Sequence, residues 1–285
     1  MRQSFVTGLV GRQDLVNAVA LNSASFNAAR IVGPAVAGLL IARFGVVPAF
    51  VVNGIGFAVV LVTLLGLSED GAVRRLRGTS IRRDIAEGVR HVARTPRLRA
   101  VLGVLFVVSL CVFNFTVYVP LLARTVLQLG PEGFGFLMAA LGVGAVAGAL
   151  ALGARANPEP GLDLLLGTAA VACGGLVGLS TVHHVWAAVP MLFVTGFAGI
   201  ITVTGCNTAI QLGSPDELRG RVMSLYTWVH GGVFPFGSFL VGATAERHGV
   251  SSALLLNGSL GLGLLLLLAI ARPWRTAVSL PGPHA

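Results

Sequence analysis

Eight long apolar stretches, separated by shorter polar segments, dominate the pattern of this chain. They lie at 19–42, 46–67, 100–123, 133–154, 162–182, 185–208, 222–245 and 250–271. Each has the roughly 20 residues that a helix needs to cross the core of a bilayer. Because backbone groups inside lipid must be hydrogen-bonded within their own segment, runs of this length predict helices. The sequence therefore predicts an all-α integral membrane protein with about eight transmembrane helices.

Composition and charge agree with a membrane location. Hydrophobic residues make up 55% of the 285 and charged residues only 11%, a more apolar balance than one water-soluble domain carries. All 20 basic residues are arginine, and nearly all lie between the apolar stretches, so the net charge of +9 predicts no nucleic-acid partner. Cys111, Cys173 and Cys206 fall inside apolar stretches, away from any cluster of metal ligands. We therefore expect no disulfide, no metal and no other cofactor.

The arginines also predict how the spans are oriented. Sixteen fall on one side of the membrane and three on the other, and Arg30 falls within a span. Because short arginine-rich loops stay in the cytoplasm, both termini and the segment 68–99 are predicted to be cytoplasmic in a multi-pass protein of the plasma or inner membrane. The amphipathic run from Ile81 to Val92 is interpreted as a topogenic anchor or, alternatively, as a helix lying on anionic headgroups.

A shift of the chain by 204 residues aligns its first two spans with its last two. Arg43 then meets Arg247, and Asn53-Gly54 meets Asn257-Gly258, at equivalent positions along the spans. Four spans lie between the two copies, so the repeating unit has six helices, as in transporters built from two parallel bundles. The predicted domains are the last two helices of an N-terminal bundle (1–67), a cytoplasmic basic linker (68–99), a six-helix C-terminal bundle (100–272) and a cytoplasmic tail (273–285).

Four short runs resemble one branch of a known transporter family. They are Arg2-Gln3-Ser4-Phe5, Leu15-Val16-Asn17-Ala18, the run from Asn27 to Gly38, and Arg219-Gly220-Arg221-Val222-Met223-Ser224. In these runs the chain resembles the enterobactin-exporter-like branch of the major facilitator superfamily. The resemblance implies the twelve-helix fold of that superfamily, of which this chain holds helices five to twelve. It also implies a secondary transporter that exports a small molecule, such as a drug or siderophore, by proton antiport.

The piece Gly33-Pro34-x-x-Ala37-Gly38 resembles the antiporter motif of the fifth helix, but Ala29 and Ala37 stand where that motif usually has glycine. Gly33 and Gly38 provide small surfaces for helix contact, and Pro34 removes a backbone donor and bends the helix. Pro235 is expected to bend the seventh span in the same way. An ordinary packing kink is the alternative for both prolines. The pairs Gly144-x-x-x-Gly148 and Gly174-x-x-x-Gly178 predict close contacts between helices.

Polar side chains at mid-span are candidates for a substrate path. They are Asn27 and Arg30 on the first span, Asn114 and Tyr118 on the third, and Trp228 and His230 on the seventh. Arg30 is a charge at mid-span, which is costly in lipid and requires a partner, so it is either a site for anions or protons or a structural tie. His230 titrates in the range that a proton relay needs. For each residue the alternative is a hydrogen bond between helices.

These features together predict a transporter whose partners are the lipid bilayer, a small-molecule substrate and protons, and they predict that the chain is not an enzyme. A membrane enzyme acting on lipid-linked substrates is a less favoured alternative, because it needs a cluster of acids or histidines at one interface and the sequence shows none. A further alternative is a truncated chain that transports nothing by itself, because four helices of the first bundle are missing.

Overall fold

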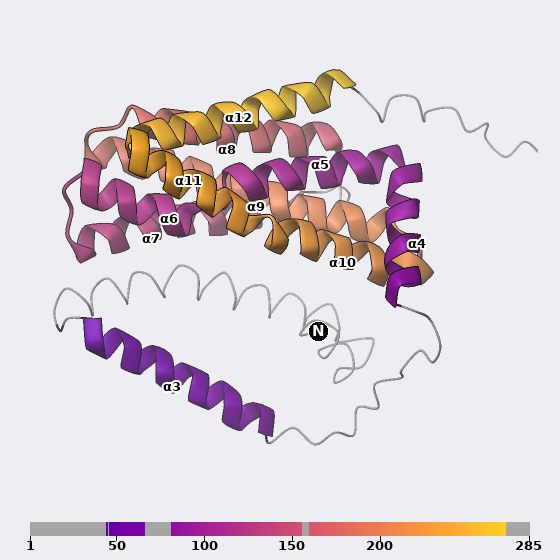
Figure 1. Cartoon of the computed structure of the whole chain (residues 1–285), viewed down its shortest axis with the longest axis horizontal. Coiled ribbons are helices and arrows are strands. Elements are labelled where there is room, and N and C mark those ends of the chain that lie inside the picture. The colour runs from indigo at the N-terminus through magenta and orange to yellow at the C-terminus, as the bar shows by residue number, and fades with distance from the viewer. Residues whose placement is uncertain (1–43, 45, 66–80, 156–159, 272–285) are drawn as a thin grey trace, which may run out of the picture. The chain divides into compact units, whose positions relative to one another are not determined.

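The computed structural model describes residues 44, 46–65, 81–155 and 160–271, and every regular element among them is a helix. The elements are α3 (Val46–Leu65), α4 (Ile81–Arg94), α5 (Pro96–Cys111), α6 (Phe115–Leu121), the π-helix η1 (Leu122–Val126), α7 (Pro131–Gly153), α8 (Leu162–Ser180), α9 (Val185–Leu212), α10 (Asp216–Gly232), α11 (Phe234–His248) and α12 (Val250–Ala271) (Figure 1). The predicted span 19–42, with Asn27, Arg30, Gly33, Pro34 and Gly38, lies outside the described residues.

The all-α membrane class predicted from the sequence is confirmed. Among the described residues, five helical segments are long and apolar enough to cross a bilayer, at 96–126, 131–153, 162–180, 185–212 and 250–271. The stretch 222–245, predicted as one span, is divided between α10 and α11. The stretch 100–123, also predicted as one span, is divided between α5, α6 and η1, and its helix begins at Pro96.

The described residues belong to two compact units. The first holds α3 and residues 129–139 at the start of α7, and the second holds the remaining described helices. α3 is apolar on every side, with large exposed side chains such as Phe50, Phe57 and Leu65. A helix without a polar face is typical of a membrane segment.

The second unit is built around α5, α8, α9 and α12. α8 packs mainly on α12 and α9, while α5 contacts α8, α9, α10, α11 and α12. Small residues let these backbones approach one another, as in other membrane bundles. Gly258 of α12 packs against the carbonyl of Cys173 on α8, and Gly261 packs against the Cys173 thiol. A hydrogen bond of 2.8 Å between the hydroxyls of Thr168 and Thr202 also joins α8 to α9.

Two pairs of glycines behave differently from each other. Gly144 and Gly148 of α7 lie directly against the backbone carbonyls of Phe193 and Phe197 on α9, as the small-residue spacing predicts. Gly196 of α9 lies in turn against the carbonyl of Leu141. In the second pair, Gly178 faces the Met191 side chain, whereas a side chain at Gly174 would meet nothing within 4 Å. The glycine spacing therefore correctly predicts the close contact between α7 and α9. In the second pair it predicts a helix contact at Gly178 but not at Gly174.

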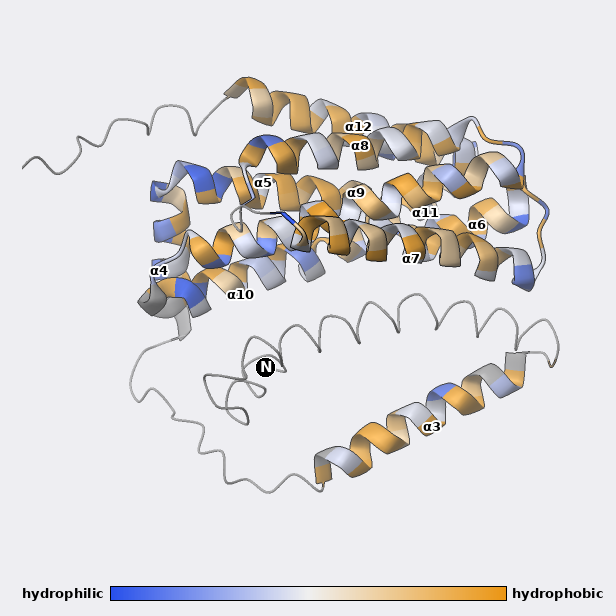
Figure 2. Cartoon of the chain, turned by 180° about the vertical axis from the view of Figure 1, so that it is seen from behind, coloured by the Kyte–Doolittle hydropathy of each residue, from blue (hydrophilic) through white to orange (hydrophobic). Residues whose placement is uncertain are grey.

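Polar and apolar residues of the second unit are arranged as a bilayer requires. Figure 2 shows apolar residues along the sides of the helices and hydrophilic residues concentrated at their ends. Large apolar side chains remain exposed on the outer helices, including Phe236 and Phe239 of α11 and Leu267 and Ile270 of α12. An exposed apolar surface of this extent indicates contact with lipid rather than water.

Candidate functional site

The first feature of the candidate site is an interruption between α5 and α6 at residues 112–114. Helical hydrogen bonding changes register here, because the Phe113 N–H donates to the Val108 carbonyl, five residues back, at 3.1 Å. The Asn114 side chain stabilises the interruption, since its Nδ2 donates to the Leu110 carbonyl at 2.6 Å. Its backbone carbonyl accepts from the N–H groups of Val117 and Tyr118 and starts α6. An asparagine that competes for backbone partners in this way ends one helix and begins the next.

The second feature is an interruption between α10 and α11 at Val233. Pro235 is among the first two residues of α11. It has no N–H to donate to the carbonyl of Gly231, one turn earlier, and this position of proline is the one that a helix start tolerates best. Two consecutive glycines, Gly231 and Gly232, end α10. The local sequence therefore accounts for a break at this point.

The two interruptions meet in space. Gly237 of α11 lies so close to α5 that a Cβ there would overlap the Leu110 carbonyl oxygen and stand 2.9 Å from Oδ1 of Asn114. Ser238, the next residue, donates a hydrogen bond of 3.0 Å to that same Oδ1. Asn114 is completely buried. One asparagine side chain thus joins the end of α5, the start of α6 and the start of α11, and we call this contact the Asn114 joint.

Beside this joint, aromatic rings gather around His230. The imidazole Nδ1 is 2.9 Å from the hydroxyl of Ser109 on α5. The ring of Phe113 meets the imidazole edge to face at 5.2 Å, and Tyr226 of α10 stacks on it at 6.0 Å. Phe115 adds an edge contact to Phe113 at 5.8 Å. These four rings, at Phe113, Phe115, Tyr226 and His230, form the aromatic cluster, and each is half-buried.

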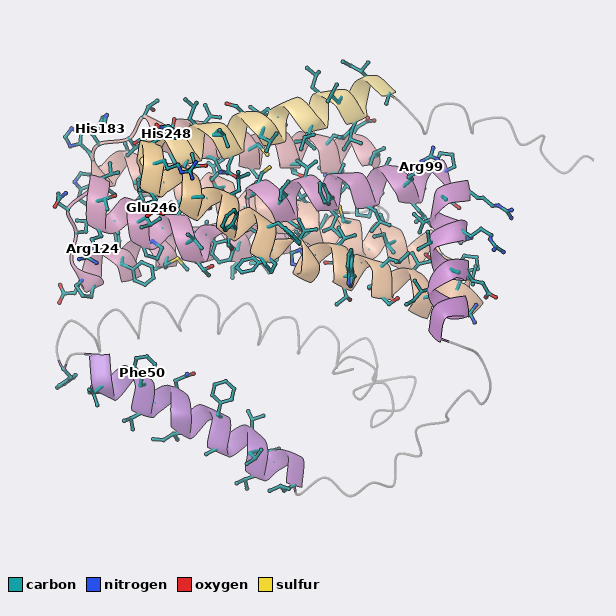
Figure 3. The ribbon with its side chains drawn as sticks, viewed as in Figure 1. Phe50, Arg99, Arg124, His183, Glu246 and His248 are labelled. Atoms are coloured by element: carbon teal, nitrogen blue, oxygen red, sulfur yellow. The ribbon has the colours of Figure 1, made fainter. Side chains whose placement is uncertain are left out.

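Charged side chains lie away from the aromatic cluster along the described helices. The acidic residues Glu132, Asp163 and Asp216 occur in first helical turns, and Glu246 occurs in the last turn of α11. Figure 3 shows Arg124, His183, Glu246 and His248 at one end of the second unit and Arg99 at the other. His230 lies in the last turn of α10, beside the interruption at Val233. No group of three His, Cys, Asp or Glu residues that could hold a metal occurs among the described residues.

The candidate residues from the sequence have different surroundings in the structure. Asn114 and His230 lie at the two interruptions, and Tyr118 is 1% exposed one turn after Asn114. Trp228, by contrast, exposes 73% of its surface. Sequence reasoning missed the partners that complete the site, namely Ser109, Phe113, Phe115, Gly237 and Ser238. A signal was present in the run Phe113-Asn114-Phe115, an amide between aromatic rings within an otherwise aliphatic stretch.

Comparison with known proteins gives consistent matches. A family profile described as "Transmembrane secretion effector" matches residues 2–280. The chain is 30% identical over 268 residues to the enterobactin exporter EntS of Escherichia coli O127:H6 (strain E2348/69 / EPEC), a match that covers 92% of this chain and 63% of that exporter. The same identity and coverage hold for the enterobactin exporter EntS of Shigella boydii serotype 18 (strain CDC 3083-94 / BS512). The chain thus spans somewhat less than two thirds of the length of these relatives.

Proposed function

Because the chain belongs to the transmembrane secretion effector family of the major facilitator superfamily, we propose that it exports a small molecule by proton antiport, with His230 as a group that carries the proton. The family and its exporter relatives support a multi-pass membrane transporter of the export type. What we propose beyond the family is the class of substrate and the use of protons as the coupling ion.

The single observation on which the proposal depends is the meeting of two interrupted helices beside a histidine. Transporters of this architecture work by rocking one helical bundle against another around a site near the middle of the membrane. An interruption removes helical hydrogen bonds, so a segment bends there more easily than in the middle of a continuous helix. The Asn114 joint places the bends in α5/α6 and α10/α11 side by side, where a movement of one segment displaces the other.

His230 gives this joint a means of responding to protons. When neutral, the imidazole Nδ1 can accept a hydrogen bond from Ser109; when protonated, both ring nitrogens are donors and Ser109 must accept. The imidazole contacts Ser109 on α5, Phe113 in the interruption that follows α5, and Tyr226 on α10. Protonation of His230 therefore reverses its hydrogen bond with Ser109, and this alters the contact between α10 and α5 beside the Asn114 joint.

We propose that the substrate is an aromatic or amphipathic molecule of the drug or siderophore type. The aromatic cluster has faces and edges that stack on planar rings. The curated relatives are exporters of enterobactin, so enterobactin is a suitable first probe, together with the planar dye ethidium.

The test is uptake of enterobactin or ethidium into everted membrane vesicles that contain this chain. An inside-acid pH gradient should drive uptake, and a protonophore should abolish it. His230→Gln keeps a polar side chain but cannot be protonated, so it should abolish the gradient-driven component while leaving downhill exchange of the probe intact. A full-length enterobactin exporter serves as the positive control, because this chain spans 63% of that length. Uptake insensitive to the gradient, or unchanged in His230→Gln, would refute the assignment.

We also propose that residues 68–99 lie on the cytoplasmic side, together with both termini. The support is the distribution of arginine in the second unit, where Arg90, Arg94, Arg97 and Arg99 gather at the α4 end, as Figure 3 illustrates for Arg99. Labelling of a cysteine at Arg90 by a membrane-impermeant reagent should occur in everted vesicles and not in intact cells. The reverse pattern would contradict this orientation.

A further inference from the structure

α4 lies across the ends of the bundle helices rather than along them. In Figure 1 it runs past the beginnings of α5 and α10, and it contacts both. A single residue, Thr95, separates it from α5, and the Thr95 hydroxyl donates to the carbonyl of His91 at 2.9 Å. The Arg99 guanidinium donates across the same corner to the carbonyl of Ala93 at 3.1 Å. α4 is therefore held at the level where the apolar part of α5 begins.

One side of α4 is docked on α10. Glu87 forms an ion pair with Arg221, and both side chains are partly buried. Next to this pair, a Cβ on Gly88 would lie 3.3 Å from the backbone carbonyl of Arg221, so the two helices approach closely at a glycine. Val92, one turn further on, is 9% exposed. Glu87, Gly88 and Val92 thus anchor α4 to the rest of the unit.

The other side of α4 carries an exposed apolar strip. Ile85 and Val89 are 51% and 48% exposed, and Ala86 and Ala93 are exposed beside them. At about 100° of rotation per residue these four positions fall within one side of the helix. Arg90 follows next around the helix, then Arg94, and both are exposed. The strip is thus bordered by guanidinium groups on the side away from the Gly88 contact.

We propose that this face of α4 lies in the membrane surface and binds the headgroups of anionic phospholipids. Three observations carry the inference: the apolar strip, the arginines that border it, and the position of α4 where the apolar part of α5 starts. An amphipathic helix with this arrangement buries its apolar side at the acyl boundary and pairs its cations with lipid phosphates. A soluble acidic partner accounts for the arginines but leaves Ile85 and Val89 in water. The inference is independent of the transport proposal, since it concerns a different surface.

The experiment places an environment-sensitive fluorophore on Ala93→Cys in the full chain, reconstituted into lipid nanodiscs. The three native cysteines are completely buried, and the protein without the added cysteine gives the labelling background. Brominated phosphatidylglycerol should quench the probe at a lower mole fraction than brominated phosphatidylcholine does. Arg90→Gln with Arg94→Gln should reduce this preference by about fivefold per arginine, or about 25-fold for the pair. Arg90→Lys with Arg94→Lys should retain it.

Arg124→Gln is the matched control, because Arg124 is an exposed arginine at the opposite end of the second unit (Figure 3). It should leave the preference at the α4 probe unchanged. Ile85→Ser with Val89→Ser should weaken quenching by both lipids. Equal quenching by the two brominated lipids would overturn headgroup recognition. Absence of quenching by either lipid would show that protein, from this chain or a second copy, covers the strip, and would overturn the proposal as well.

Discussion

Replacing Gly237 with alanine should destabilise the protein far more than the same change at Gly242 on the same helix. At Gly237 the added methyl group overlaps the Leu110 carbonyl oxygen and stands 2.9 Å from Oδ1 of Asn114. Carbon and carbonyl oxygen ordinarily meet at about 3.3 Å or more, so α11 must move from α5 by roughly 1 Å. At Gly242 the methyl group meets nothing within 4 Å.

The magnitude follows from three terms. Overpacking costs about 1–3 kcal/mol, and loss of the Ser238–Asn114 hydrogen bond costs about 0.6 kcal/mol in a membrane bundle. Both variants gain up to about 1 kcal/mol from the better helix propensity of alanine, so this term cancels between them. The two variants should therefore differ by about 2–4 kcal/mol in the free energy of unfolding.

The measurement uses the protein's own thiols. Cys111, Cys173 and Cys206 are completely buried, so a thiol-reactive dye becomes fluorescent only as the detergent-solubilised protein unfolds. Gly237→Ala should melt roughly 5–15 °C below Gly242→Ala. Melting of the two variants within about 2 °C of each other would show that α5 and α11 do not pack closely at the interruption, and the reasoning on the Asn114 joint would fail.

Two further predictions use the same thermal assay, and a third adds a measurement of hydrogen exchange. Ser238→Ala should cost only about 0.6 kcal/mol, because it removes one hydrogen bond without a clash; a loss as large as that of Gly237→Ala would contradict this. Gly144→Ala should lower the melting temperature strongly, since the methyl group overlaps the Phe193 carbonyl, whereas Gly263→Ala, with open space around it, should not. Glu87→Gln should change stability by less than about 1 kcal/mol, because the pair with Arg221 is partly exposed, yet it should speed hydrogen exchange in α4; unchanged exchange would show that the ion pair does not anchor that helix.

The class of fold was predictable from the sequence, and the details of the site were only partly so. Lipid requires long apolar helices, so runs such as 162–182 and 250–271 indicate spans without any knowledge of their neighbours. Pro235 gave a local signal for a break in 222–245. The break at 112–114 contains neither proline nor glycine, and it depends on the side-chain bonds of Asn114. The bond to Leu110 is local, but the bond that Asn114 accepts from Ser238 comes from a residue 124 positions away, which local propensity does not encode.

The pairing of His230 with Ser109 was beyond sequence reasoning for a different reason. The two residues are 121 positions apart, and nothing in either local pattern specifies the other. Their contact is set by how α5 packs on α10, which depends on many weak surfaces of small residues. The hypothesis that His230 serves as a proton relay could be formed from residue type alone, whereas the identity of its neighbours could not.

The seam between α7 and α9 has a consequence for how force passes through the second unit. At Gly144 the main chain of α7 lies directly against the main chain of α9, and at Gly148 it meets the Phe197 carbonyl and the Ile200 side chain. Little at these two contacts can reorient to absorb a displacement. A tilt imposed on α9 is consequently passed to the facing stretch of α7. Because α7 and α9 move as a rigid pair, bending concentrates at the breaks in α5/α6 and α10/α11, where main-chain hydrogen bonds are fewer.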